Sequence, residues 1–167
     1  MPVMDTLSAW SRALRDPSLR DLPYKIETNE YGQLVMSPQK PKHGHAQSRI
    51  TVLLSQLVTH PGRGAVEFAI ETPKGVKLPD VVWISEKRWC GIPADVEASP
   101  VAPEICIEVL SKSNTAAEID EKRRLYFDRG AVEVWTCDAN GAMRFFTASG
   151  EQPASPLVLD FPTQVDL

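Results

Sequence analysis

The chain has 167 residues and a net charge of −4, with 43% hydrophobic and 24% charged residues. This length is usual for one domain, and the composition is globular rather than disordered or fibrous. No apolar run approaches the ~20 residues that cross a bilayer, and the N-terminus lacks a secretory signal pattern. We therefore expect no membrane segment and a cytoplasmic location.

The cysteines and the charge exclude further classes of protein. Cys90, Cys106 and Cys137 are far apart and lack CxxC spacing, which argues against a disulfide framework and a zinc site. An acidic protein is not a simple nucleic-acid binder, because duplex binding depends on Lys and Arg contacts with phosphate. Basic residues cluster within 40–49 and 122–129, so a local basic face is still possible.

The first third of the chain predicts two helices separated by a hairpin. Residues 5–15 have the apolar spacing of a short amphipathic helix. The runs YKIETN and QLVMSP, on either side of EYG, predict a β-hairpin. A second amphipathic pattern predicts a helix that begins near His45 and ends at PGRG, residues 61–64.

The remainder predicts strands, one helix and another hairpin. AVEFAIET, KLPDVVWIS and EICIEVLS have the composition of strands, and the last is strongly apolar. Thr115 and Glu118 form a capping-box pattern that starts a helix, and Gly130 ends it. VEVWTCD and MRFFTA, joined by ANG, predict a hairpin. The order predicts an α/β protein, with an α+β mixed sheet flanked by helices.

Two carboxylates fall on strands that are otherwise apolar. Strand alternation places Asp80 on the face of Val82, and Glu108 on the face of Cys106. A buried carboxylate must be paired, protonated or bound to a metal, because leaving it unpaired costs several kcal/mol. A structural ion pair with Arg or Lys would satisfy either residue alone. Two such residues on core strands favour a divalent cation, because Mg²⁺ prefers carboxylate, water and phosphate oxygens.

A lysine lies on the core-facing stripe of the helix that starts after Thr115. At 100° per residue, Lys122 shares one arc with Ile119, Leu125 and Tyr126. It could snorkel from the rim of this stripe, with only its stem buried. It could also point toward the two carboxylates and stabilise charge that develops on a phosphate.

These motifs together resemble the Uma-type family of restriction endonucleases, within the PD-(D/E)XK superfamily. The resemblance covers residues 22–147 and rests on QLVMSP, the helix near His45, PD at 79–80, EVLS at 108–111, Lys122 with Tyr126, and GAVEVW at 130–135. It implies a restriction-endonuclease-like core with an N-terminal helical extension over 1–21 and a tail over 148–167, all in one domain.

The resemblance also implies that Asp80 and Glu108 bind Mg²⁺ or Mn²⁺. In the superfamily the active lysine stands two residues after the second acid, where this chain has Leu110. Members like this one draw the lysine from the following helix, which matches Lys122. Lys112 is a rival on the same strand face, but its Cα would be ~13 Å from that of Glu108.

Two further residues are weaker candidates. Family relatives often carry a histidine where this chain has His45, although a histidine at a helix start or on the surface is the better explanation. Glu27, in the first hairpin, is expected to face solvent. The tryptophans and the Phe145–Phe146 pair could stack on bases, but packing in the core is the better expectation.

The sequence thus predicts a divalent-metal-dependent endonuclease that acts on DNA, with Asp80, Glu108 and Lys122 as catalytic residues. A degenerate nuclease fold that serves as a binding module is the alternative, which the acidic charge and Leu110 favour. A structural protein whose carboxylates merely pair with Arg or Lys is a third possibility. We also expect a homodimer, formed through the C-terminal hairpin or residues 86–103.

Overall fold

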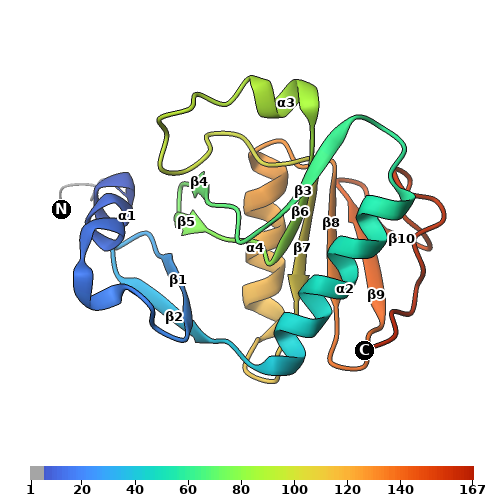
Figure 1. The fold of residues 1–167 in the computed structure, drawn as a ribbon, viewed down its shortest axis with the longest axis horizontal. Coiled ribbons are helices and arrows are strands. Elements are labelled where there is room, and N and C mark those ends of the chain that lie inside the picture. Colours follow the sequence, from blue (N-terminus) through green and yellow to red (C-terminus); the bar gives the residue numbers. More distant parts are fainter. Residues whose placement is uncertain (1–5) are drawn as a thin grey trace.

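A six-stranded mixed sheet forms the centre of the molecule (Figure 1). The computed structural model describes residues 6–167. The strand order is β10-β9-β8-β7-β6-β3, with β7 and β8 parallel and all other neighbours antiparallel. The strands are β3 (Gly62–Val66), β6 (Val81–Ser85), β7 (Ile105–Val109), β8 (Glu133–Cys137), β9 (Met143–Thr147) and β10 (Gly150–Gln152). The expected mixed sheet flanked by helices is confirmed.

Two helices cover opposite faces of this sheet (Figure 1). Helix α2 (Pro41–Leu57) packs Ile50 and Leu54 on the face that contains Ile107. Helix α4 (Ala116–Asp128) packs Tyr126 on the other face. The remaining helical segments are α1 (Thr6–Arg15), the 3-10 turn η1 (Pro17–Leu19) and α3 (Glu86–Cys90). Among residues 6–167, no helix has the length and apolarity that a bilayer crossing requires.

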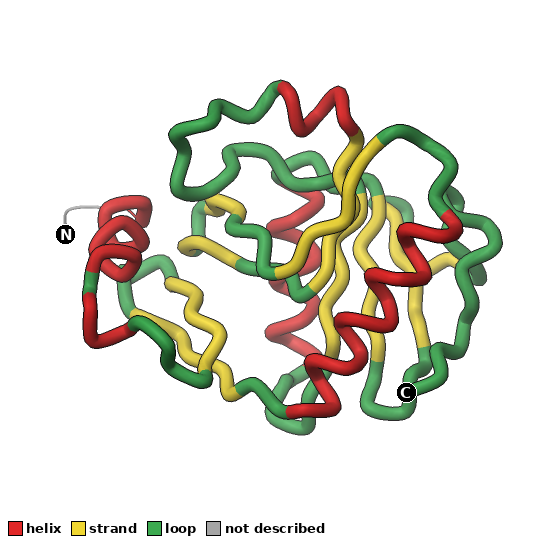
Figure 2. Tube along the Cα trace, in the orientation of Figure 1, coloured by secondary structure: helices red, strands yellow, loops and turns green. Residues whose placement is uncertain are grey.

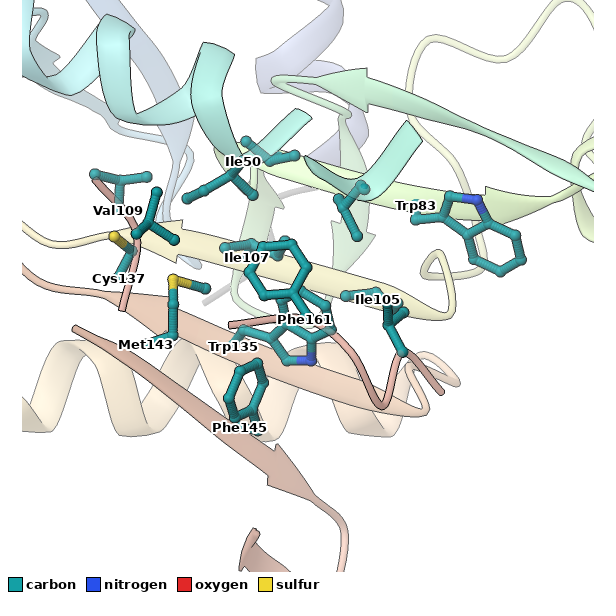
Figure 3. Close-up of a cluster of buried hydrophobic side chains, with 14 of the residues drawn as sticks. Ile50, Trp83, Ile105, Ile107, Val109, Trp135, Cys137, Met143, Phe145 and Phe161 are labelled. Atoms are coloured by element: carbon teal, nitrogen blue, oxygen red, sulfur yellow. The ribbon is translucent and has the colours of Figure 1, made fainter. Parts of the chain in front are cut away.

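The larger core lies between α2 and the sheet (Figure 3). Trp135 meets Phe145 edge-on, with 5.0 Å between ring centroids, and lies 4.6 Å from the Phe161 ring. Phe161 and Val165 are buried here, so the last residues of the chain pack into the core. Core packing is therefore confirmed for Trp83, Trp135, Phe145 and Phe146, whereas Trp89 is 39% exposed.

Two small sheets lie beside the large one (Figure 2). The first is the expected hairpin of β1 (Tyr24–Thr28) and β2 (Leu34–Pro38). The second pairs β4 (Ile70–Thr72) with β5 (Gly75–Lys77). The single strand expected for AVEFAIET is wrong. Glu67 has φ 50°, a left-handed conformation that breaks the strand, so β3 and β4 belong to different sheets.

The glycines after α2 start a strand as well as ending the helix. A Cβ on Gly62 would lie 2.5 Å from both the Ile84 carbonyl oxygen and the Trp83 ring. Only glycine therefore allows β3 to approach β6 at this point. The PGRG pattern predicted the helix end but not this close approach.

The helix starts agree with the sequence in two places and differ in one. The capping box of α4 is formed as expected, since Thr115 and Glu118 each accept a backbone N–H of the other. The helix expected over 5–15 is α1, although Asp5 lies outside the described residues. Helix α2 begins at Pro41 rather than near His45. Proline is favoured in the first turn of a helix, where its missing N–H costs no hydrogen bond.

Candidate active site

Asp80 and Glu108 meet where strands β6 and β7 lie side by side. Val82 pairs with Cys106 in this antiparallel ladder, so continuing the register brings Asp80 opposite Glu108. Asp80 directly precedes β6, and its Oδ2 accepts the Val109 N–H at 2.7 Å. Both carboxylates are almost fully buried, with 1% and 4% of their surface exposed. The two acids singled out from the sequence therefore share one buried location.

A lysine that the sequence did not single out bridges the two acids. Lys25 Nζ lies 2.9 Å from Asp80 Oδ1 and 3.8 Å from Glu108 Oε2. The ammonium also donates to the Leu78 carbonyl at 3.1 Å. Lys25 comes from β1, so the first hairpin contributes directly to the site.

Helix α4 contributes a second ammonium and a hydroxyl. Lys122 Nζ lies 2.8 Å from Glu27 Oε1 and 3.4 Å from Glu108 Oε1. One turn later, the Tyr126 hydroxyl donates to Glu108 Oε1 at 2.5 Å. The structure therefore brings Lys122 to the carboxylates, as its place on the core-facing stripe suggested.

Helix α2 supplies the remaining neighbours of Asp80. His43 Nε2 lies 3.1 Å from Asp80 Oδ1, and Gln47 Nε2 donates to the same oxygen at 3.3 Å. These two residues are one helical turn apart, so they share a face. His45 is exposed, so the surface position that the sequence favoured for it is confirmed, and the site takes His43 instead. The cause is the helix start at Pro41, one turn earlier than expected.

Glu27 is buried, with 3% of its surface exposed, so the expectation that it faces solvent is also wrong. Its Oε2 accepts the Leu78 N–H at 2.6 Å, and its carboxylate pairs with Lys122. Lys25 and Glu27 alternate with Ile26 along β1, so their polar face points inward and Ile26 points the other way. The expectation that the polar face of a strand points to solvent fails here, because this face of β1 lies on a charged pocket.

The two acids differ in their protonation energetics. Burial raises the pKa of Glu108, and the neighbouring carboxylates of Asp80 and Glu27 raise it further against the two lysines. Burial acts to raise the pKa of Asp80 as well, but the hydrogen bond with His43 and the charge of Lys25 outweigh it and hold that pKa below the usual range. Such a divergence of pKa values is typical of adjacent carboxylates in a functional site.

A cavity of about 430 Å³ opens onto these groups. Its walls include Asp80, Glu108, Lys25 and Lys122, and its rim carries Ser37, Lys40, Ser111, Lys112 and Ser113. Lys112 is exposed, whereas Lys122 is held against the acids. The exposed part of the lining is thus basic and hydroxyl-rich, and the buried part holds the two acids paired with two lysines.

The donor set fits a hard divalent cation between the two acids. Within residues 6–167, no cluster of three or more His, Cys, Asp or Glu side chains forms a closed metal cage. Mg²⁺ does not need one, since it usually keeps several waters and takes one or two carboxylates. Asp80 Oδ1 and Glu108 Oε2 already converge on one cation, the Lys25 ammonium.

Comparisons with known proteins give a family model that matches most of the chain and a solved structure with a similar fold. The model of the Uma2 family, described as "Putative restriction endonuclease", matches residues 17–164. One solved structure, titled a "putative nuclease belonging to DUF820" from Anabaena variabilis ATCC 29413, superposes with a TM-score of 0.67 at 17% identity. The alignment covers 83% of this chain and 86% of that one. A search of curated protein sequences gave no match.

Proposed function

The chain belongs to the Uma2 family of restriction-endonuclease-like proteins, and we propose that it is a divalent-metal-dependent endonuclease that hydrolyses phosphodiester bonds of DNA. The observation that carries this proposal is the convergence of Asp80 and Glu108 in a cavity with a basic rim. The two buried acids favour a cation between them, and the lysines of the rim attract a phosphate.

Each group has a distinct role in the proposed reaction. Asp80 and Glu108 would hold Mg²⁺ or Mn²⁺, and the ion would supply an activated water and neutralise charge on the phosphate. Lys122 orients the attacking water or stabilises the charge that develops on the phosphate. Tyr126 fixes the Glu108 carboxylate through its hydrogen bond, and Glu27 fixes Lys122. Lys40 and Lys112, which line the cavity and are exposed, would contact neighbouring phosphates.

DNA would contact a limited face of this acidic protein. The cavity lining includes Lys40, at the start of α2, and Lys112, in the loop between β7 and α4. Phosphate contacts from these two segments supply affinity without sequence specificity. We therefore expect binding that weakens as the salt concentration rises.

A second candidate function is a binding module that has lost catalysis. The specific observation in its favour is that Lys25 already pairs with both acids, and that Leu110 occupies the usual lysine position. In this case the basic rim would bind a nucleic acid or protein without cleaving it.

Metal binding and DNA cleavage measured on the same sample test both candidates. We expect Mn²⁺ or Mg²⁺ to raise the melting temperature, and the protein to cleave supercoiled plasmid in the same buffer, because the ion binds only the folded site. EDTA should reverse both effects. A thermal shift without cleavage would support the binding module, and the absence of a shift would leave the carboxylates with a structural role.

We also propose a homodimer in solution, because two active sites can then address two strands. The C-terminal hairpin lies inside the sheet, between β7 and β10, so it offers no free edge. Residues 86–103 keep Trp89 and Val96 exposed, at 39% and 41%. We therefore expect Trp89→Ala to shift a dimer toward monomer in multi-angle light scattering. A monomeric wild type at working concentration would contradict the proposal.

A further inference from the structure

The Lys25 ammonium stands where the proposed function needs a metal. It lies between Asp80 Oδ1 and Glu108 Oε2, and only 7% of the Lys25 surface is exposed to solvent. We propose that Lys25 is a built-in counter-ion that occupies the cation position in the metal-free protein and leaves it when the divalent cation binds. This inference rests on the proposed function and adds a regulation of the same site.

Lys25 is the lysine that must leave, and Lys122 is the one that stays. Glu108 Oε1 is engaged by Lys122 and by the Tyr126 hydroxyl, which leaves Oε2 turned toward Lys25. Lys122 has its shortest contact with Glu27, at 2.8 Å. The two carboxylate oxygens that point toward the same position are therefore Asp80 Oδ1 and Glu108 Oε2, which both face Lys25. A divalent ion held by both acids would use this pair.

The ammonium and a divalent ion cannot share this position. Mg²⁺ binds carboxylate oxygens at ~2.0–2.1 Å and requires near-ideal octahedral geometry. Lys25 Nζ is 2.9 Å from the Asp80 oxygen that the ion would take, so the two cations would be in contact. Their repulsion would be strong, because few water molecules screen charges in a buried site.

The cavity offers the displaced side chain a place to go. Its lining includes Lys25 itself and the side chains of Ser37, Ser111 and Ser113. A lysine has a flexible four-carbon stem, and its ammonium can exchange a carboxylate for hydroxyls and water. The stem must rotate into the cavity, and this makes the ammonium more accessible from solvent.

The exchange would also change the net charge of the pocket from negative to positive. In the metal-free protein, three carboxylates face two ammonium groups, so negative charge is in excess. The ion adds two positive charges while Lys25 stays within the cavity. A phosphodiester is then attracted to the acids of a loaded site, whereas in the metal-free protein only the basic rim attracts it. The exchange therefore makes substrate binding conditional on metal binding, and it weakens the apparent metal affinity, since the acids must first release Lys25.

A pair of lysine variants tests the exchange by calorimetric Mn²⁺ titration. Lys25→Met should bind Mn²⁺ at least about tenfold more tightly than the wild type, because no internal cation competes. Lys77→Met is the matched control. Lys77 also donates to a backbone carbonyl, that of Thr28 at 2.8 Å, and is half-buried nearby. This control should bind Mn²⁺ like the wild type.

Amine labelling of the wild type separates exchange from a simple charge effect. Mn²⁺ should increase the acetylation rate of Lys25, read by mass spectrometry, while the rate at Lys77 stays constant. If Lys25→Met folds only in the presence of Mn²⁺, that metal dependence also supports the exchange.

Two results would overturn the proposal. The first leaves the proposed metal site intact, and the second removes it as well. Unchanged labelling of Lys25 in a protein that does bind Mn²⁺ means that the lysine stays in place, and the metal site survives without the exchange. This holds even if Lys25→Met binds more tightly, since removing the ammonium that contacts both acids can raise affinity without any exchange. No Mn²⁺ binding by either the wild type or Lys25→Met removes the metal site of the proposed function and the exchange with it.

Discussion

Replacing Asp80 with Asn should lower the melting temperature of the metal-free protein by roughly 10 °C or more, whereas Glu108→Gln should change it by only about 2 °C. Both variants should lose the thermal shift with Mn²⁺ and the cleavage of DNA. The two acids are thus expected to be equivalent for function and different for stability.

The difference follows from their hydrogen bonds. Asp80 accepts from Lys25, His43 and Gln47 on one oxygen and from the Val109 N–H on the other. An Asn amide has one acceptor, so its NH₂ group would face a donor wherever it pointed. Removing one partner of a buried charge pair typically costs ~3–5 kcal/mol, and each kcal/mol corresponds to ~2–4 °C in a chain of this size.

The negative charge of Glu108 contributes less to stability than that of Asp80. Its Oε1 accepts from Tyr126, and a Gln side-chain carbonyl can accept the same bond. Lys122 keeps Glu27, and Lys25 keeps Asp80, so neither ammonium is left alone. Since burial raises the pKa of Glu108, the folded protein disfavours the charged form that Gln removes.

The pH dependence gives a further check on the same pair of variants. The lowered pKa of Asp80 means that its contribution to stability is present at neutral pH and is lost as the pH falls below its unfolded value. The raised pKa of Glu108 acts in the opposite sense, so its charge destabilises the fold as the pH rises above its unfolded value. The stability of Glu108→Gln relative to the wild type should therefore increase with pH. Equal losses of melting temperature in both variants, at every pH, would contradict this assignment.

Much of the site could be predicted because the two acids break a strong pattern. KLPDVVWIS and EICIEVLS are apolar on both faces, so a carboxylate in them is conspicuous, and their antiparallel pairing in neighbouring strands brings the acids together. Lys122 could be placed because helical periodicity fixes the side of α4 on which it lies.

The partners of the acids could not be found in the same way. Lys25 and Glu27 lie on a short hairpin, and strand alternation alone cannot tell which face is buried. They face inward because the pocket is itself charged, and this depends on contacts with Asp80 and Lys122 from distant parts of the chain. His43 was within reach of the sequence, since Pro41 marks the start of α2.

Lys122→Met should reduce the rate of DNA cleavage by about 10²–10³-fold and leave the Mn²⁺-induced thermal shift intact. Methionine keeps the length of the side chain and removes its charge. The acids that would hold the ion are Asp80 and Glu108, and both keep the ammonium of Lys25 as partner before the ion binds. The loss should therefore appear in the cleavage step and not in metal binding, in single-turnover assays on plasmid DNA at saturating Mn²⁺.

Two further variants make this result specific to Lys122. The substitution leaves Glu27 buried without its ammonium partner, so the metal-free protein should lose stability. Adding Glu27→Gln removes that charge and keeps an acceptor for the Leu78 N–H, so the double variant should regain stability without regaining cleavage. Lys112→Met, at the exposed rim, should lose no more than about tenfold, in binding rather than in rate. If Lys112→Met abolished cleavage while Lys122→Met retained it, Lys112 would be the active lysine, because the rim ammonium would then be the one that reaches the reacting phosphate.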